Sequence, residues 1–522
     1  MTGKHTITSL DLSYSTKPIA DSVGETTPSY DELANLTCFR TCSGAPGESV
    51  TSPVSRDAMH PLLYERSVEG QLYRRGLLRG STIVFFCAGY PSKKFIYELA
   101  AKCGIKSIIV DDHDSWAKGL VVEGVISAFV GVDMSQEVNN VYVEALVALR
   151  SLGRQIDGVC TFVELSVGIS ARLNQALGLV GAHPDLVDIA RDKSETRAVL
   201  EAKGLPNVKN TMIYSESDLD DAAAKIGFPA VLKPVSGAAS LGVQKVNSKE
   251  EFVKVYNEVS EILNGLIVAS GALERKVTNS SGDENGHDAV HAASVINCTV
   301  LMEEYLDGPE VDVDVVMSNG ECQYATVIDN GPTSEPYFGE TWAALPSLLP
   351  LDHVAELRDL AIASVKGIGF TDGVYHVELK YTSRGPRLIE VNARMGGGPT
   401  RMIHKLVFGI DLVIEQFLIA IGVPSRPLIP STPLTHIAYS FINARSSGSV
   451  ASVAFIQEHA KRDNVVWVLT YVKNGEKVVG PEDGHPTWLG DVVVQHPDGH
   501  EALRIVKEIE NEIATEFHNR RI

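Results

Sequence analysis

The chain has 522 residues, of which 44% are hydrophobic and 21% are charged, a composition typical of a folded multidomain protein. The formal net charge of −20 and the isoelectric point near 5.2 argue against a nucleic-acid partner, because sequence-independent binding to phosphate backbones needs clustered Lys and Arg. No apolar run approaches the ~18 residues of a membrane span, so we expect no membrane partner either.

Residues 1–78 are rich in Ser, Thr, Pro and Gly, and we interpret them as a partly ordered N-terminal extension. The first thirty residues contain acidic side chains and no apolar core, so they resemble neither a secretory nor an organelle-targeting peptide, and a cytoplasmic location is expected. The seven cysteines include no Cys-x-x-Cys pair. Cys87 and Cys160 lie in apolar runs, which predicts reduced, buried thiols.

Strand and helix patterns alternate over residues 79–191. An apolar run at 82–90 ends near a glycine, a helical pattern follows at 93–104, and 106–112 has the pattern of the next strand. This order predicts an α/β domain with a parallel sheet and crossover helices. A dinucleotide-binding fold is the rival interpretation, but the segment 88–92 lacks the Gly-x-Gly-x-x-Gly spacing that pyrophosphate binding requires.

The pattern changes near residue 192, and we predict a second domain over 192–425. Strand patterns dominate after Lys233 and its small-residue loop, with a polar stretch at 271–294 that has the composition of a surface insertion. Residues 426–522 form a further α+β segment that closes with an amphipathic helix.

Two predicted strands, 373–382 and 386–394, are joined by a tight hairpin. Successive side chains of a strand alternate between faces, so Glu390, Asn392 and Arg394 should share one face. On the partner strand His376, Glu378 and Lys380 alternate in the same way. If the register pairs the two faces, two carboxylates and an amide oxygen converge, and such ligands suit Mg²⁺. The alternative is a solvated face with cross-strand ion pairs, which the following glycines at 396–398 disfavour.

Two other segments carry groups suited to a nucleotide. Lys233 precedes the loop 236–242, whose backbone N–H groups could close over phosphate oxygens while the lysine supplies a charge. In the stretch 303–310, EEYLDGPE, backbone groups could bind adenine and Glu310 could accept both ribose hydroxyls. Each segment alone is also compatible with an ordinary loop or turn.

The order of these elements resembles that of the ATP-grasp superfamily. A pre-ATP-grasp α/β domain, Lys193, Lys233 with its loop, EEYLDGPE, Glu378 and the Glu390-x-Asn392 pair follow one another along the chain. Three strings, AGYPSKKFI, HVELK and RLIEVNARMGG, are most similar to the carnosine synthase group of amino acid ligases. The long members of that group carry a large additional N-terminal part, which leaves the amino acid pair of this chain open.

The resemblance implies a reaction and a set of site residues. A carboxylate is activated by ATP as an acyl phosphate, and an amine then attacks it to form an amide, with release of ADP and phosphate. The implied ATP ligands are Lys193, Lys233, Ser236, Gly237 and Ser240 at the phosphates, Glu303, Glu304 and Leu306 around the adenine, and Glu310 at the ribose. The implied ligands of Mg²⁺ or Mn²⁺ are Glu378, Glu390 and Asn392.

Two further side chains are candidate catalytic residues. Arg394 could stabilise the acyl phosphate and the oxyanion that follows it; its alternative is a salt bridge to Glu378 or Glu390. His376 has three open interpretations: it contacts phosphate, it supports the residues that bind the metal, or it simply fills a strand position.

Other functions stay open at this point. A biotin-carboxylase-like carboxylation shares the fold, although the sequence has no Met-Lys-Met acceptor for biotin. A catalytically silent nucleotide-binding module is the other alternative, and the intact set of Glu378, Glu390, Asn392 and Arg394 argues against it. The expected partners are small amino acids or amines, and the resemblance also allows a homo-oligomer.

Overall fold

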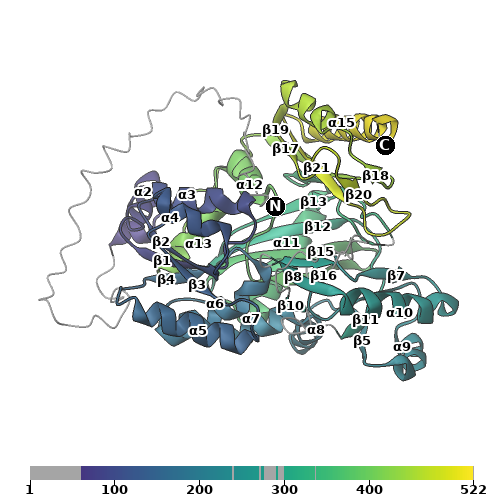
Figure 1. The fold of residues 1–522 in the computed structure, drawn as a ribbon, viewed down its shortest axis with the longest axis horizontal. Coiled ribbons are helices and arrows are strands. Elements are labelled where there is room, and N and C mark those ends of the chain that lie inside the picture. The colour runs from purple at the N-terminus through teal and green to yellow at the C-terminus, as the bar shows by residue number, and fades with distance from the viewer. Residues whose placement is uncertain are drawn as a thin grey trace, which may run out of the picture. The chain divides into compact units, whose positions relative to one another are not determined.

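The computed structural model describes residues 60–237, 240–269, 272–275, 290–291, 299–335 and 337–520. The chain divides into two compact units, and the second of them takes in the residues from His436 onward. The ribbon in Figure 1 shows the elements of both units. Most of the predicted N-terminal extension lies outside the described residues.

The described end of that extension is folded. Helix α2 (Val68–Gly76) follows the short helix η2 (Pro61–Leu63), and its Ser67 cap accepts a hydrogen bond from the Gly70 N–H. The buried guanidinium of Arg74 donates to the carbonyl oxygens of Leu62, Glu65 and Arg426 at 3.0, 2.8 and 2.6 Å. These bonds satisfy the buried cation and fix α2 against the chain near residue 426.

A four-stranded parallel sheet of order β3-β2-β1-β4 follows, as predicted for 79–191. Its strands are β1 (Thr82–Phe86), β2 (Lys106–Asp112), β3 (Ala128–Val132) and β4 (Gly158–Cys160), and helices α3 (Lys94–Lys102), α5 (Val138–Ser151) and α6 (Val167–Leu177) connect or follow them. Cys87 and Cys160 are buried free thiols, which confirms that prediction. The strand order reverses between β1 and β4, and ligands of open α/β sheets bind at the carboxyl end of such a switch point.

A four-stranded antiparallel sheet of order β5-β11-β6-β7 begins the next domain. Its strands are β5 (Asn210–Ile213), β6 (Ala230–Pro234), β7 (Gln244–Val246) and β11 (Val300–Glu304), and its buried side chains pack with those of α9 (Leu219–Ile226) and α10 (Lys249–Asn264). Of the predicted insertion at 271–294, only β9 (Ala272–Arg275) and β10 (Val290–His291) are described, and both pair with β8 (Leu266–Ala269).

The larger sheet of this unit positions the polar groups. Its strands lie in the order β16-β15-β12-β13-β14, with β12 (Glu310–Ser318), β13 (Glu321–Asn330), β14 (Trp342–Leu345), β15 (Gly373–Thr382) and β16 (Gly385–Asn392). On one face, alternate apolar residues such as Val313, Val377 and Val391 pack with α11 (Leu351–Ile368). The residues between them therefore point to the opposite face.

The second unit begins at His436, within the segment 426–522 for which an α+β pattern was predicted. Strands β17 (His436–Asn443) and β19 (Val465–Thr470) pair antiparallel with β21 (Trp488–His496), and α15 (Gly499–Arg520) packs on one face of them. Within the described part of the chain, no helix has both the length and the apolarity that crossing a bilayer would require.

Candidate active site

Three neighbouring strands carry acidic and polar side chains on the face opposite α11. In β12 and β15 the opposed pairs are Glu310 with Lys380, Asp312 with Glu378, and Asp314 with His376. In β15 and β16 they are His376 with Asn392 and Glu378 with Glu390. Directly opposed side chains lie within reach of one another, so alternation along three separate strands produces one polar surface.

The predicted pairing of the hairpin faces is confirmed. The Asn392 amide nitrogen lies 3.3 Å from a Glu378 oxygen and 3.2 Å from a Glu390 oxygen. The two carboxylates and the amide thus form one compact group at the end of β16.

Negative charge accumulates on this surface. Burial, together with the neighbouring carboxylates of Glu390 and Asp312, raises the pKa of Glu378 well above its ordinary value. Burial also raises the pKa of Glu310 to about 7, even though the Lys380 ammonium lies 3.6 Å away. These raised pKa values show that the neighbouring carboxylates disfavour one another's ionised forms. A cation bound between them would favour the ionised forms.

Two lysines predicted to contact ATP phosphates lie beside this surface. Lys193 is the first residue of α8 (Lys193–Ala202), and its ammonium lies 2.6 Å from a Glu390 oxygen. Burial opposes the ionisation of Glu390, but Lys193 brings its pKa down to about 2. The Lys193 N–H donates to the Val235 carbonyl at 3.1 Å, which joins the start of α8 to the segment after Lys233.

Lys233, at the end of β6, belongs to a buried ionic group. Its ammonium lies 2.5 Å from one Glu303 oxygen, and the other Glu303 oxygen accepts from Arg197 Nε at 2.8 Å. Arg197 also donates to the Ile389 carbonyl at 2.7 Å, so α8 connects β16 with β11. Glu303, which the sequence analysis placed beside adenine, thus anchors two cations.

The other predicted nucleotide residues lie in the segments that follow Lys233 and Glu303. Glu304 accepts from the Lys209 N–H at 3.1 Å and lies 3.0 Å from Arg384, while Leu306 is buried. In the predicted phosphate loop, Ser236 is buried and Ser240 has a φ of +54°, a left-handed conformation. Gly237 precedes the two alanines of the loop, which lie outside the described residues.

The prediction for Arg394 needs correction in two respects. Strand β16 ends at Asn392, so Arg394 lies in the bend that follows and not on the strand face of Glu390. Its Nε lies 2.7 Å from Glu164, which follows β4 at the switch point of the parallel sheet, so the ion pair is with neither Glu378 nor Glu390. The cause is the end of the β ladder, which frees the backbone to turn toward the parallel sheet.

A second cation lies in the same region. Lys93 donates to the Phe162 carbonyl at 2.8 Å, two residues before Glu164. Burial and the nearby Arg394 lower the pKa of Lys93 to about 8. The two cations meet the same short segment after β4, where an anionic substrate group would find complementary charge.

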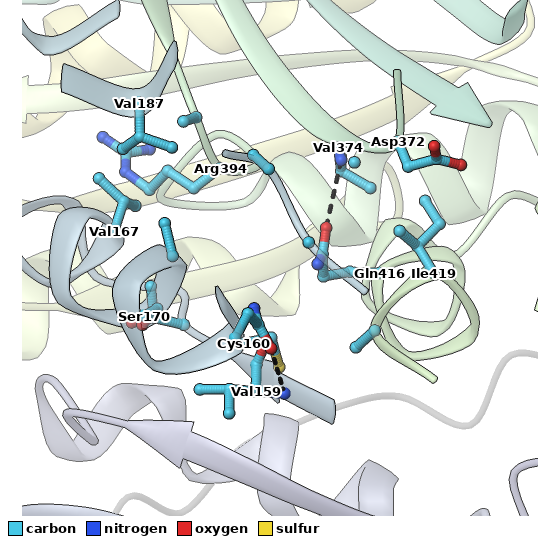
Figure 2. Close-up of a pocket in the computed structure, with 18 of the residues that line it drawn as sticks. Val159, Cys160, Val167, Ser170, Val187, Asp372, Val374, Arg394, Gln416 and Ile419 are labelled. Atoms are coloured by element: carbon cyan, nitrogen blue, oxygen red, sulfur yellow. Dashed lines mark hydrogen bonds between the residues drawn. The ribbon is translucent and has the colours of Figure 1, made fainter. Parts of the chain in front are cut away.

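A small cavity lies behind Arg394. Figure 2 shows Arg394 extending toward Val187 at one end, with Asp372 and Gln416 at the other. The Val374 N–H donates to the Gln416 amide oxygen at 3.2 Å. The cavity holds about 70 Å³, enough for ordered water.

Sequence reasoning missed several residues of the site. They are Glu164, Arg197, Asp312, Asp314 and His404. The alternation of acids with valines in 309–316, PEVDVDVV, is a signal that could have placed Asp312 and Asp314 on one strand face. No local pattern near Glu164 or Arg197 predicts their ion pairs, because the partners, Arg394 and Glu303, lie far along the chain.

The residues present fit a magnesium ion that also binds a substrate. Among the described residues, no group of three or more His, Cys, Asp and Glu side chains is arranged to hold a metal ion. Glu378 and Glu390 supply hard oxygen ligands, the Asn392 side chain could add its amide oxygen by turning, and Mg²⁺ commonly completes such a set with water and phosphate oxygens. The excess negative charge around Glu378 favours a cation there.

The chain is similar to known ATP-grasp proteins. The ATP-grasp domain family matches residues 272–401. Human carnosine synthase 1 is 30% identical over 424 residues, which are 78% of this chain and 48% of that protein. The chain therefore spans about half the length of the carnosine synthase that it matches.

Two bacterial proteins extend the comparison. The alanine–anticapsin ligase of Bacillus subtilis is 28% identical over 265 residues, which cover 49% of this chain and 52% of the ligase. The crystal structure of an L-amino acid ligase from Bacillus licheniformis superposes with a TM-score of 0.67 at 20% identity, covering 83% of this chain and 98% of the other. That likeness concerns the fold.

Proposed function

Because the chain belongs to the ATP-grasp superfamily, we propose that it is an ATP-dependent ligase that joins the carboxylate of one amino acid to the amine of another. The observation that carries this proposal is the surface of β12, β15 and β16, where Glu378, Glu390 and Asn392 converge beside Lys193. The similarity to amino acid ligases supports the class of substrate.

The proposed reaction has two steps. A carboxylate oxygen attacks the γ-phosphorus of ATP, the bond to the β,γ-bridging oxygen breaks, and ADP leaves with that electron pair. The amine nitrogen then attacks the acyl carbon, phosphate leaves, and the nitrogen loses a proton. The products are an amide, ADP and phosphate.

Phosphoryl transfer requires chiefly positioning and neutralisation of charge. We assign Lys193 and Lys233 to the ATP phosphates and Glu378, Glu390 and Asn392 to Mg²⁺. The bound ion would neutralise charge on phosphate oxygens. Since Asn392 offers its amide nitrogen to both carboxylates in the structure, its amide oxygen would turn inward when it binds the ion.

Arg394 supplies the charge nearest to the reacting carboxylate in this proposal. Its guanidinium is held by Glu164 at the switch point of the parallel sheet, and a fixed donor of this kind stabilises a developing oxyanion without reorganisation. Lys93, at the same edge, adds a second positive charge.

The test is a screen of amino acid pairs for ADP release, with mass spectrometry of the products. We expect ADP release that depends on both amino acids and a product whose mass is their sum minus water. Release that depends on bicarbonate and needs no amine would indicate carboxylation. ATP binding without release under any pair would indicate a non-catalytic module.

A further inference from the structure

One fully buried carboxylate connects the candidate site with the glycines that follow it. Asp314 lies at the centre of a cluster that comprises Tyr324, His404, Asp314, His376 and Gly396. One Asp314 oxygen lies 3.1 Å from His376 Nδ1 and accepts from the Gly396 N–H at 3.2 Å. The other lies 2.8 Å from His404 Nε2, and His404 Nδ1 lies 2.8 Å from the Tyr324 hydroxyl.

The chemistry of a carboxylate fixes the direction of the hydrogen bonds to Asp314. An ionised carboxylate only accepts, so His376 Nδ1 and His404 Nε2 must both carry a hydrogen and donate to Asp314. His404 Nδ1 and the Tyr324 hydroxyl form the outer bond of the cluster. The cluster is therefore fully satisfied on the side away from the site, and only the Nε2 edge of His376 points elsewhere.

That edge faces the acidic surface. His376 Nε2 lies 3.7 Å from an Asp312 oxygen and 4.0 Å from the Glu378 oxygen that also contacts Asn392. Both separations are too long for a hydrogen bond. The Nε2 edge is thus directed at the acidic group without being bonded to either of its carboxylates.

The backbone of Gly396 closes the other side of the ring. A Cβ at this residue would lie 2.8 Å from His376 Nδ1 and 2.7 Å from the Thr400 hydroxyl, closer than such atoms approach in proteins. A Cβ at Gly397 would meet nothing within 4 Å. A side chain at Gly396 would therefore displace His376, Thr400 or both, whereas a side chain at Gly397 would displace neither.

We propose that Asp314 is a positioning residue of the ligase: it holds His376 Nδ1 and the Gly396 N–H together, so that the Nε2 edge of His376 is aimed at the acyl phosphate and metal side of the site. This proposal rests on the proposed function. It selects an active-site role for His376 over that of a plain strand position, and it gives Gly396 a role in keeping the ring in place.

The sharpest test compares the same substitution at two adjacent glycines. We expect Gly396→Ala to lower the rate of phosphate release by about 10- to 100-fold, the usual loss when a supporting contact of an active-site group is removed. Gly397→Ala should stay within about two-fold of the parent. Calorimetry with Mg²⁺-ATP should give dissociation constants within about three-fold for both variants, because the lysines and carboxylates are untouched.

A second readout does not depend on turnover. Proton–nitrogen NMR of protein with ¹⁵N-labelled histidine reports which ring nitrogen carries the hydrogen, and His376 is identified by the signal lost in His376→Gln. We expect Nδ1 of His376 to be protonated in the parent and in Gly397→Ala. The His376 signal should shift in Gly396→Ala and in Asp314→Asn, which turns one acceptor oxygen into a donor.

These results separate the two proposals. If the parent releases no ADP with any amino acid pair but the NMR pattern is as expected, the proposed function fails and the positioning contact stands. Gly396→Ala with parental turnover and an unchanged His376 signal would overturn the positioning role, whatever becomes of Asp314→Asn.

Discussion

Two carboxylates in the same unit, the buried Glu303 and the partly exposed Glu378, differ in what surrounds them. Glu303 is held by Arg197 and Lys233, and although burial opposes its ionisation these two cations lower its pKa to about 2. Burial and the charges of Glu390 and Asp312 instead raise the pKa of Glu378 well above its ordinary value.

The difference indicates which carboxylate has strong cationic partners within the protein. Glu303 contacts both Arg197 and Lys233, and these contacts join β11, β6 and α8. Among the described residues Glu378 pairs with no Lys or Arg, since the nearby Lys193 pairs with Glu390, and a carboxylate whose pKa is perturbed in this way is a marker of a ligand site. Substitutions at the two carboxylates should therefore have opposite consequences for stability and activity.

The largest expected effect is on stability at Glu303. Glu303→Gln leaves Arg197 and Lys233 buried without a counter-charge, and we expect it to lower the free energy of unfolding at pH 7 by about 3–5 kcal/mol. Urea unfolding measures this. Glu304→Gln is the matched control, since its ion pair with the half-exposed Arg384 should be worth about 1 kcal/mol or less.

The pH dependence of the free energy of unfolding of Glu303→Gln tests the same explanation, because the direction of the change with pH can be predicted. The Glu303 pKa is lower in the folded than in the unfolded chain, so its stabilisation is present above about pH 4.5 and is lost as the pH falls toward 2. The difference between parent and Glu303→Gln should shrink over that range. A constant difference would mean that packing, and not charge, causes the loss.

Glu378→Gln should behave in the opposite way. It removes a carboxyl group whose ionised form is disfavoured in the folded protein by burial and by Glu390 and Asp312, so the free energy of unfolding should be unchanged or higher. Phosphate release should fall by roughly 100-fold or more because a metal ligand is lost. The remaining activity should need more Mg²⁺. A loss of stability as large as that of Glu303→Gln would remove the distinction between the two groups.

Arg394→Ala tests the role of the guanidinium that pairs with Glu164 beside the parallel sheet. We expect turnover to fall about 100-fold, the cost of one transition-state donor, while Mg²⁺-ATP affinity stays close to parental. Glu164→Gln keeps the guanidinium but removes its ionic partner, so it should have a smaller effect. If Arg394→Ala has the same nucleotide affinity and the same turnover as the parent, Arg394 takes no part in the reaction.

The smallest effect concerns a lone acid in the C-terminal unit. Asp491 is buried, accepts from the Tyr471 hydroxyl, and has its pKa raised to about 7 by burial. The folded state thus keeps a proton that the unfolded state loses near pH 4, so this residue lowers stability as the pH rises from about 4 to 7. We expect Asp491→Asn to be more stable than the parent by about 1–3 kcal/mol at pH 8, and no more stable at pH 4, by thermal or urea unfolding.

Local pattern was sufficient for part of the site. A tight turn joins β15 to β16, so alternation predicted that Glu378, Glu390 and Asn392 would converge if the two faces paired, and the register pairs Glu378 directly with Glu390. The parallel sheet was likewise predicted from alternating strand and helix patterns. In both cases the interacting residues are brought together by short connections.

Long-range pairing was beyond such reasoning. Asp314 meets His376, 62 residues further along the chain, and Arg197 meets Glu303, 106 residues further along. These contacts depend on which strands and helices lie side by side. Because no short turn connects the paired elements, the local sequence does not predict that arrangement. The position of Arg394 was wrong for a related reason, since the end of β16 is set by where pairing with β15 stops.

The central claim is that a carboxylate is activated as an acyl phosphate, and oxygen transfer tests it most directly. The amino acid that serves as acid is labelled with ¹⁸O in its carboxylate, the ligation is run with the second amino acid and Mg²⁺-ATP, and the released phosphate is analysed by ³¹P NMR or mass spectrometry. We predict that one ¹⁸O atom appears in each phosphate released. Unlabelled phosphate, with the dipeptide still formed, would contradict the account.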